Sequence, residues 1–417
     1  MPRPTPWSRR TAMKLGLWAL GVTTATQIGA AVTVIAVDQI RKQRQPPSGE
    51  FPHSPPMTTE VAGSIVTTYT YGEYLYADML AAIESAHEVI YFETFIWKND
   101  EVGNRFKAAL IDAADRGVQV YVVYDGFANM VVDPRFYRFP GNLHVLRFPA
   151  VRPGMLTLNI RYYGRDHRKL LVVDHHVGFV GGYNIGAAYA TTWRDTHLRV
   201  VGPAVWEVEN AFVDFWNDHR RSYHPELRDR GSLAWESRIR ASRNAPHRML
   251  FPVRGLYLDA IDRATARVYI TQAYFLPDRE ILATLLAAAK RGVDVRIIVP
   301  EHSNHIVADW ASRWYYTALL EGGVTIWLFQ DAMVHAKTAT VDGRWSTVGT
   351  ANIDRLSLIG NYEVNLEIFS DDQATFMEEA FDRDLTNCRQ LLLEEWQDRG
   401  MLSRVGEHII AWLQPLL

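Results

Sequence analysis

Two copies of one motif divide this chain of 417 residues into two similar halves. The motif reads His-x-Lys-x4-Asp-x6-Gly-x-x-Asn, and each residue of the second copy lies 168 positions after its counterpart (335 − 167 = 168). The copies consist of His167, Lys169, Asp174, Gly181 and Asn184, and of His335, Lys337, Asp342, Gly349 and Asn352. Five matched positions at one constant offset indicate an internal duplication, so we expect one folding unit to be used twice.

Strand-like and helix-like patterns alternate in the same order in both halves. Strands are expected at residues 89–97, 118–124, 143–148, 170–173, 268–275, 293–299, 324–329 and 338–341, and helices at 74–87, 105–116, 256–263 and 281–291. Such alternation favours an α/β fold with a parallel or mixed sheet. The sequence therefore predicts two duplicated α/β/α halves, packed about a pseudo-two-fold axis with the motifs at the seam.

The residue types of the motif suit chemistry on a phosphodiester. His and Lys two positions apart on a strand point to the same face, so two facing copies gather two imidazoles, two ammonium groups and two amides. The cations and amides can hold the non-bridging oxygens where charge develops. One His can attack phosphorus, while the other protonates the leaving oxygen and then deprotonates the acceptor. Because Lys supplies positive charge, we expect neither a metal ion nor a cofactor.

Each half also contains a carboxylate at a matched position. Asp195 lies 28 residues after His167 (195 − 167 = 28), and Glu363 lies 28 residues after His335 (363 − 335 = 28). A histidine at a reactive centre is usually oriented through its second ring nitrogen. We therefore expect Asp195 and Glu363 to orient the two histidines.

The aspartate of each motif copy has two interpretations. Asp174 and Asp342 belong to the candidate catalytic set by their place in the motif. Each also stands at a strand end directly before a turn, where a short acidic side chain often ties the backbone together.

On these residues the sequence resembles the phospholipase D superfamily and, within it, the bacterial cardiolipin synthases. The narrower resemblance rests on Glu93-Thr-Phe-Ile-Trp97, Trp193-Arg-Asp-Thr-His197, Tyr274-Phe-Leu-Pro-Asp278, Ala311-Ser-Arg313, Gly349-Thr-Ala-Asn-Ile-Asp-Arg355, Asn361, Glu363 and Asn365. It covers residues 60–417 and implies a duplicated fold and a phosphatidyl transferase. The motifs are specific for the superfamily but less so for the reaction, because hydrolases and transferases share them.

The resemblance implies a reaction that joins two phosphatidylglycerols into cardiolipin and glycerol. The substrate phosphate would lie between Lys169, Lys337 and the two motif asparagines. By family analogy His167 forms a phosphatidyl-histidine, and His335 carries the proton. Three alternatives stay open: a phospholipase D that uses water, a nucleic-acid phosphodiesterase, and a non-catalytic lipid-binding scaffold, which has no need of paired histidines.

Composition narrows the partners of the protein. With 44 basic and 47 acidic residues the net charge is −3, whereas non-specific nucleic-acid binders usually have a basic footprint. We therefore expect a phospholipid substrate and a membrane surface as partners, with no nucleic acid and no obligate protein partner. Cys388 is the only cysteine, so an intramolecular disulfide is excluded.

The first 50 residues differ from the rest. Residues 15–37 contain no charge and, as a helix, are long enough to span a bilayer. Ser8-Arg-Arg-Thr-Ala-Met-Lys14 also resembles a twin-arginine export signal. We expect a membrane anchor or a cleaved signal at the bacterial cell membrane. Either would place the body outside the cytoplasm, and the side of the membrane stays open. The expected organisation is an anchor and linker at 1–50, halves at 60–220 and 254–417, and a connector at 221–253 that includes an edge strand at 237–242.

Two further segments lie near the expected site or membrane. The first half has a longer connection before its motif, residues 149–165, than the second half. We expect this insertion to border the pocket, where it helps to admit an acyl chain or shields the site, or to be an ordinary surface loop. Residues 402–417 have the spacing of an amphipathic helix, which would lie in the membrane interface or pack on the body.

Overall fold

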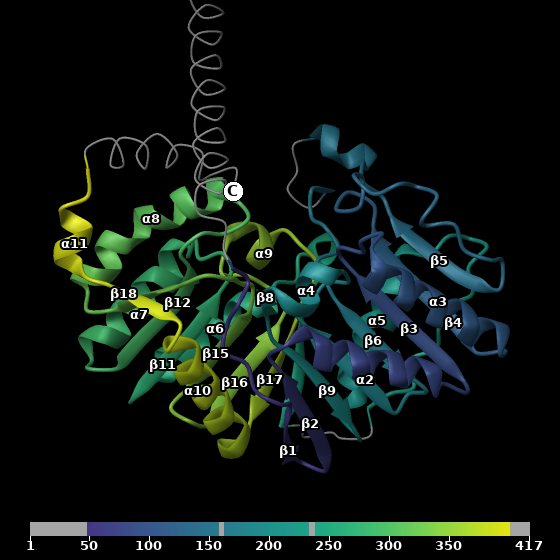
Figure 1. Ribbon diagram of the computed structural model, residues 1–417, viewed down its shortest axis with the longest axis horizontal. Helices are drawn as coiled ribbons and strands as arrows, with labels where there is room; N and C mark the ends of the chain where they lie inside the picture. Colours follow the sequence, from purple (N-terminus) through teal and green to yellow (C-terminus); the bar gives the residue numbers. More distant parts are fainter. Residues whose placement is uncertain (1–47, 158–161, 233–237, 401–417) are drawn as a thin grey trace, which may run out of the picture.

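Two eight-stranded sheets stand side by side, each with helices on both faces (Figure 1). This computed structural model describes residues 48–157, 162–232 and 238–400. The predicted duplicated α/β architecture is confirmed. The uncharged stretch 15–37 and the tail 402–417 lie outside the described residues.

The first sheet is mixed. In spatial order its strands are β1 (Met57–Val61), β2 (Ser64–Tyr69), β9 (His197–Val201), β7 (Val177–Gly181), β6 (Leu170–Val173), β3 (Val89–Thr94), β4 (Gln119–Asp125) and β5 (Leu143–Phe148). The neighbours β3, β4 and β5 run parallel, and all other pairs are antiparallel. The motif strand β6 therefore begins at the edge where β3, β4 and β5 end.

The second sheet repeats this arrangement. Its strands are β10 (Ile239–Asn244), β17 (Glu363–Phe369), β16 (Trp345–Gly349), β15 (Lys337–Val341), β11 (Arg267–Gln272), β12 (Asp294–Pro300), β13 (Thr325–Phe329) and β18 (Cys388–Leu391). The run from β17 to β13 has the same order and directions as the run from β9 to β5. The edge strand β10 lies in the segment expected to connect the halves.

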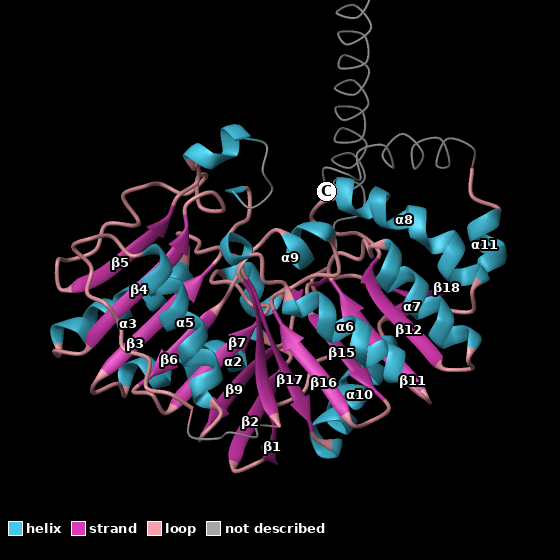
Figure 2. Cartoon of the chain, turned by 180° about the vertical axis from the view of Figure 1, so that it is seen from behind, coloured by secondary structure: helices cyan, strands magenta, loops and turns pink. Residues whose placement is uncertain are grey.

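Helices cover both faces of both sheets (Figure 2). They are α2 (Gly72–Glu84), α3 (Glu101–Asp115), α4 (Ala187–Thr191), α5 (Val205–His219), α6 (Pro252–Arg263), α7 (Arg279–Lys290), α8 (Ile306–Glu321), α9 (Arg355–Ile359), α10 (Asp371–Leu385) and α11 (Leu393–Gln397), with 3₁₀ turns η1 (Pro153–Thr157) and η3 (Pro246–Arg248). In the first half α2 and α3 pack on one face of the sheet and α5 on the other. Among the described residues no helix combines the length and apolar character needed to cross a bilayer.

The expected helix ends at Gly117 and Gly292 are present. Both glycines have a positive φ, +96° and +90°, which glycine adopts without the penalty that a side chain brings. The next residue then turns back, because Val118 N–H donates to the carbonyl of Ala113 and Val293 N–H to that of Ala288. This C-terminal cap lets each helix lead directly into a parallel strand, β4 or β12.

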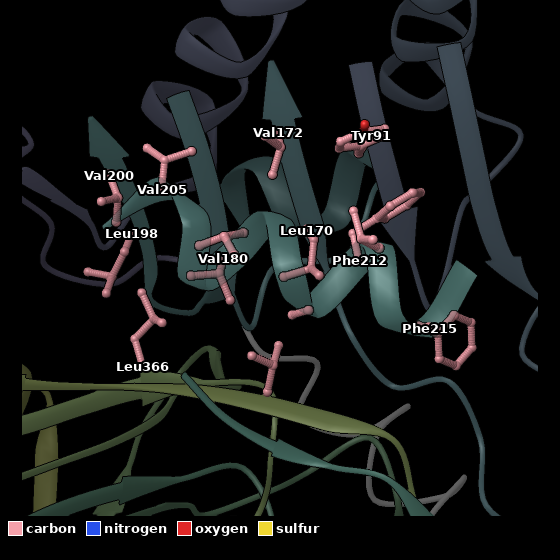
Figure 3. Packing of buried hydrophobic residues seen from close by; sticks show 14 of the residues in the cluster. Tyr91, Leu170, Val172, Val180, Leu198, Val200, Val205, Phe212, Phe215 and Leu366 are labelled. Atoms are coloured by element: carbon pink, nitrogen blue, oxygen red, sulfur yellow. The ribbon is translucent and has the colours of Figure 1, made fainter. Parts of the chain in front are cut away.

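A continuous apolar core joins the two halves. On one face of the first sheet, Val172 and Val180 pack against Phe212 of α5, and the same cluster extends to Leu366 and Ile368 of β17 (Figure 3). A short ribbon also crosses the seam, since β8 (Trp193–Arg194) pairs in parallel with β14 (Met333–Val334). The halves therefore form one body, and the seam carries main-chain as well as side-chain contacts.

Candidate active site

Both motif histidines stand at the seam, at the start of a strand. His167 precedes β6, and its main-chain N–H donates to the carbonyl of Tyr362 at 3.1 Å. His335 precedes β15, and its N–H donates to the carbonyl of Arg194 at 2.6 Å. In each case the acceptor belongs to the other half of the chain, so the seam positions both histidines through their main chain.

Each histidine is paired with the carboxylate of the opposite half. Nδ1 of His167 lies 3.0 Å from both carboxylate oxygens of Glu363, and Nδ1 of His335 lies 2.6 Å from Oδ2 of Asp195. All four side chains are buried. A proton on Nδ1 leaves Nε2 as the reactive nitrogen of each ring. Each carboxylate therefore contacts the histidine of the opposite half, reciprocally across the seam, in the place that an orienting group would take.

Short main-chain pairings explain this exchange. In the β8–β14 ribbon Arg194 is paired with Val334, so the residues that follow, Asp195 and His335, come together. On the other side an isolated bridge pairs Asp166 with Tyr362, next to His167 and Glu363.

The motif lysines lie deep in the site. Lys169 is 2 % and Lys337 0 % exposed, and each ammonium group donates to the carbonyl of its own motif histidine, at 2.5 Å for Lys169. A lysine buried to this degree is rare unless it has an anionic partner. The two lysine side chains thus place positive charge close to both histidines.

The motif asparagines each have a buried polar atom with no hydrogen-bond partner among the described residues. In Asn184 this atom is Nδ2, because Oδ1 accepts from the N–H of Ile96 at 3.1 Å. In Asn352 it is Oδ1. Buried polar groups are nearly always satisfied, so a polar ligand is expected here. Rotation of the Asn352 amide would present its NH₂ group to a phosphate oxygen.

The motif aspartates lie at the other end of the motif strands. The carboxylate of Asp174 accepts from three main-chain N–H groups, those of His87, Glu88 and Val89. Asp342 binds the equivalent N–H groups of residues 265–267 before β11. Five residues of extended chain separate Asp174 from Lys169, about 16 Å. We propose that both aspartates are structural, which is the second of their two interpretations.

Comparisons with known proteins agree with this geometry. The profile of the family described as cardiolipin synthase, phospholipase D-like domain, matches residues 79–216 and again residues 257–385. The chain belongs to this family. A cardiolipin synthase of Listeria monocytogenes (serotype 4a) is 32 % identical over 369 residues, which are 84 % of this chain and 75 % of that protein. The major cardiolipin synthase ClsA of Bacillus subtilis is 31 % identical over the same shares of the two chains.

The fold of this family member is shared with a more distant enzyme. The crystal structure of a phosphatidylserine synthase from Haemophilus influenzae aligns with a TM-score of 0.65 at 14 % identity, and the alignment covers 91 % of this chain and 97 % of that one. At this identity the likeness concerns the fold alone.

The two histidine–carboxylate pairs of this family member differ in charge. Burial alone would raise the pKa of Asp195, but the charge of Lys337 and the hydrogen bonds from His335 and from the N–H of Thr196 outweigh it, and the pKa is below its usual value. For Glu363 burial prevails over Lys169 and raises the pKa to about 8. At neutral pH the empty site therefore holds an ionised Asp195 and a largely protonated Glu363.

Burial also acts on the cationic groups. It lowers the pKa of Lys169 to about 7 and that of Lys337 to about 8. Burial and the nearby lysines lower the pKa of His335 to about 3 and hold that of His167 well below its ordinary value. A bound phosphodiester brings a negative charge, which favours the protonated form of all four groups. The site is thus arranged to gain positive charge when an anion enters.

Several residues that support the site were absent from the predicted set. Thr350 Oγ1 donates to Glu363 at 2.5 Å, and the ring of Phe95 lies 4.7 Å from that of His167. In the other half, the ring of Trp193 lies 5.2 Å from that of His335. All three occur in the sequence segments that carried the family resemblance, which is the signal that could have found them.

Two buried ion pairs lie beside the main chain of His167 and Asp195. Arg168 contacts Glu93 at 2.5 Å, directly next to His167. Arg194 contacts Asp384 at 2.7 Å and also donates to the carbonyl of Asp195. The second motif has Ala336 at the position of Arg168, so a comparison of the two copies gave no indication of the first pair. No group of three or more His, Cys, Asp or Glu side chains suited to a metal ion occurs in the described ranges.

Proposed function

We propose that this protein is a cardiolipin synthase, which joins two phosphatidylglycerols and releases glycerol. The observation that carries the proposal is the reciprocal assembly of two His–Lys–Asn sets at one seam, with each histidine bound by the carboxylate of the other half. The nature of the donor and acceptor follows from the named relatives, which are 31–32 % identical over 84 % of this chain.

In the first step the phosphate of one phosphatidylglycerol lies against the two lysines and the asparagine amides. Nε2 of His167 attacks phosphorus, and a P–N bond forms. The P–O bond to the glycerol headgroup breaks, and His335 gives its proton to the departing oxygen. The lysines stabilise the charge that grows on the non-bridging oxygens.

In the second step a second phosphatidylglycerol enters as acceptor. Its primary hydroxyl gives a proton to His335 and attacks phosphorus, and the P–N bond to His167 breaks. The products are cardiolipin and the free enzyme, and the proton taken up by His335 replaces the one that it gave in the first step. Water in the place of the acceptor would give phosphatidic acid, so the seam must favour a lipid alcohol over water.

The unequal carboxylates support this division of roles. An ionised Asp195 at 2.6 Å stabilises a positive charge on His335, which suits the residue that carries the proton. Glu363, with its pKa raised to about 8 by burial, offers less negative charge to His167. His167 therefore stays neutral more readily, as a nucleophile must.

The membrane setting is part of the same proposal. We propose that residues 15–37 hold the enzyme at the bacterial cell membrane, because they are uncharged and long enough to span it. Such an anchor would keep the enzyme close to its lipid substrate.

Mass spectrometry of lipids tests the proposal directly. The full-length protein is incubated with phosphatidylglycerol vesicles in EDTA, and the lipids and free glycerol are measured. Cardiolipin together with an equal amount of glycerol supports the transferase. Phosphatidic acid alone would assign the protein to the hydrolases, and a product formed only after phosphatidylethanolamine is added would change the acceptor. His176→Ala, at an exposed histidine, is the matched control for the histidine variants described below.

A further inference from the structure

Exposed apolar side chains gather on two loops of the first half. One loop, residues 126–138, follows β4, and the other, whose described parts are residues 149–157 and 162–165, follows β5. Val131 is 85 %, Val151 79 % and Leu156 92 % exposed. Large apolar residues exposed to this degree and close in the fold commonly mark an interaction surface. We call the described residues of these loops, 126–138, 149–157 and 162–165, the docking loops.

The docking loops lie at the same edge as the active site. Strands β4 and β5 end at the edge where β6 begins, and the 3₁₀ turn after β5 projects beyond the strand ends (Figure 1). Asp125, at the base of the first loop, accepts a hydrogen bond from the N–H of Asp166 at 3.2 Å. Asp166 is the residue directly before His167.

The charge of this part of the sequence is strongly positive. The described residues of the docking loops contain four arginines and one acidic residue, Asp133, in a chain whose net charge is −3. The guanidinium group of Arg165 lies 4.6 Å from the ring centre of Phe127, an exposed residue of the first loop. Exposed apolar side chains beside arginine favour a surface that is apolar inside and negatively charged outside.

We propose that the docking loops bind an anionic lipid bilayer, so that the side chains of Met130, Val131 and Leu156 enter the acyl layer. This inference rests on the proposed function, because an enzyme that acts on phosphatidylglycerol must reach a lipid whose phosphate lies at the membrane surface. Docking at this edge turns the mouth of the seam toward the bilayer. The substrate phosphate then reaches His167 without leaving the interface entirely.

Site-specific fluorescence tests the proposal with the full-length protein. In a Cys388→Ser background, which removes the only native cysteine, Met130→Cys and Leu156→Cys are labelled with an environment-sensitive dye. The matched controls are Ile65→Cys and Phe369→Cys, which are 46 % and 43 % exposed. Both control positions lie at the strand ends that point away from the active site. Phe369, for example, is six residues beyond Glu363 on β17.

The probe is a vesicle of phosphatidylglycerol and phosphatidylcholine with brominated acyl chains, which quench dyes that enter the bilayer. We expect a blue shift and at least twofold quenching at positions 130 and 156, and neither effect at 65 and 369. A protein that co-sediments with the vesicles while positions 130 and 156 show no change would overturn the proposal. Equal responses at all four positions would do the same, because they would indicate no preferred face.

A second measurement separates this inference from the proposed function. The same labelling is repeated in His335→Ala, which needs no turnover to report contact. If positions 130 and 156 are quenched but the protein with both histidines forms no lipid product, the docking loops are supported and the proposed synthase activity is rejected. Cardiolipin formation without quenching would do the reverse. For the triple variant Met130→Ser/Val131→Ser/Leu156→Ser, the ratio of turnover on vesicles to turnover on dispersed short-chain phosphatidylglycerol should fall at least tenfold, and an unchanged ratio would count against the docking loops.

Discussion

Nδ1 of His335 lies 2.6 Å from Oδ2 of Asp195, although 140 residues separate them in the sequence. Glu363 holds His167 in the same way from the other direction, over 196 residues. Each half of the chain therefore contains one motif histidine and the carboxylate that contacts the motif histidine of the other half.

The two carboxylates should respond differently to amide substitution. Glu363 is largely protonated at pH 7 because burial raises its pKa to about 8, so Glu363→Gln preserves much of its hydrogen bonding, and we expect a loss of about tenfold in kcat, or about 1.4 kcal/mol. Asp195 is ionised, and Asp195→Asn removes that charge. A loss of about 10⁴-fold is expected, by comparison with the amide variant of a serine protease triad.

Initial rates of cardiolipin formation for both variants at pH 7 provide the check. Asp195→Glu serves as a second comparison that keeps the charge but changes the reach. Equal losses in Glu363→Gln and Asp195→Asn would contradict the assigned difference in ionisation.

Both histidines are expected to be indispensable for turnover. His167→Ala removes the nucleophile and His335→Ala the proton carrier, and since these groups act as a unit, each change should lower kcat by about 10³-fold or more. His176→Ala should retain the full rate, and thermal unfolding should show that all three variants are folded. Substantial activity in His335→Ala would argue against a two-histidine mechanism.

Binding of the anionic substrate should weaken at alkaline pH. Lysine is charged below its pKa, and burial sets the pKa values of Lys169 and Lys337 at about 7 and about 8 in the empty site. As pH rises through this range, the free enzyme loses positive charge, so kcat/KM should fall, mainly through a higher KM. A profile from pH 5 to 10 measures this, and a flat profile to pH 10 would be inconsistent with it.

Lysine substitution gives the matched comparison. Lys169→Met or Lys337→Met should lower kcat/KM at pH 6 by about 10²-fold to 10³-fold, the usual cost of losing one group that stabilises developing charge. The same change at the exposed Lys290 should leave both the rate and the pH profile as they are.

The motif aspartates should affect stability more than chemistry. Asp174→Ala leaves three main-chain N–H groups without their acceptor and places alanine at a φ of +50°, so we expect a loss of about 2–4 kcal/mol in the free energy of unfolding. Urea denaturation measures this, with Asp262→Ala, at an exposed helical position, as control. A stable variant with abolished turnover would instead return Asp174 to the catalytic set.

The duplicated motif was enough to predict two similar α/β halves, and the structure places its two histidines together with Asp195 and Glu363 at one seam. A constant offset between two copies reveals equivalence, and the alternation of strands with helices then specifies the two sheets. The offset does not say which carboxylate contacts which histidine, because Asp195 has the same separation from His167 as Glu363 has from His335. The exchange depends on the two-residue strands β8 and β14, which are too short to be recognised by periodicity.

Contacts between unlike positions of the two halves were also beyond sequence comparison. Arg168 and Glu93 form a buried ion pair in the first half, whereas the second motif has Ala336 in the place of the arginine. A search for matched residues passes over such a pair because it is unmatched. The roles of Asp174 and Asp342 had two interpretations for another reason, since a motif gives spacing along a strand but does not say which end faces the reaction.

The reciprocal carboxylates have a consequence for how such a chain could arise. A protein with only one half would lack the carboxylate that its histidine needs, and two identical copies related by a two-fold axis would restore both pairs at once. Fusion of the copies into one chain removes the requirement that they be identical. One half could then keep Asp195 for a proton-carrying histidine, while the other acquired Glu363 for a nucleophile, so that two equal sites became one site with two separate tasks.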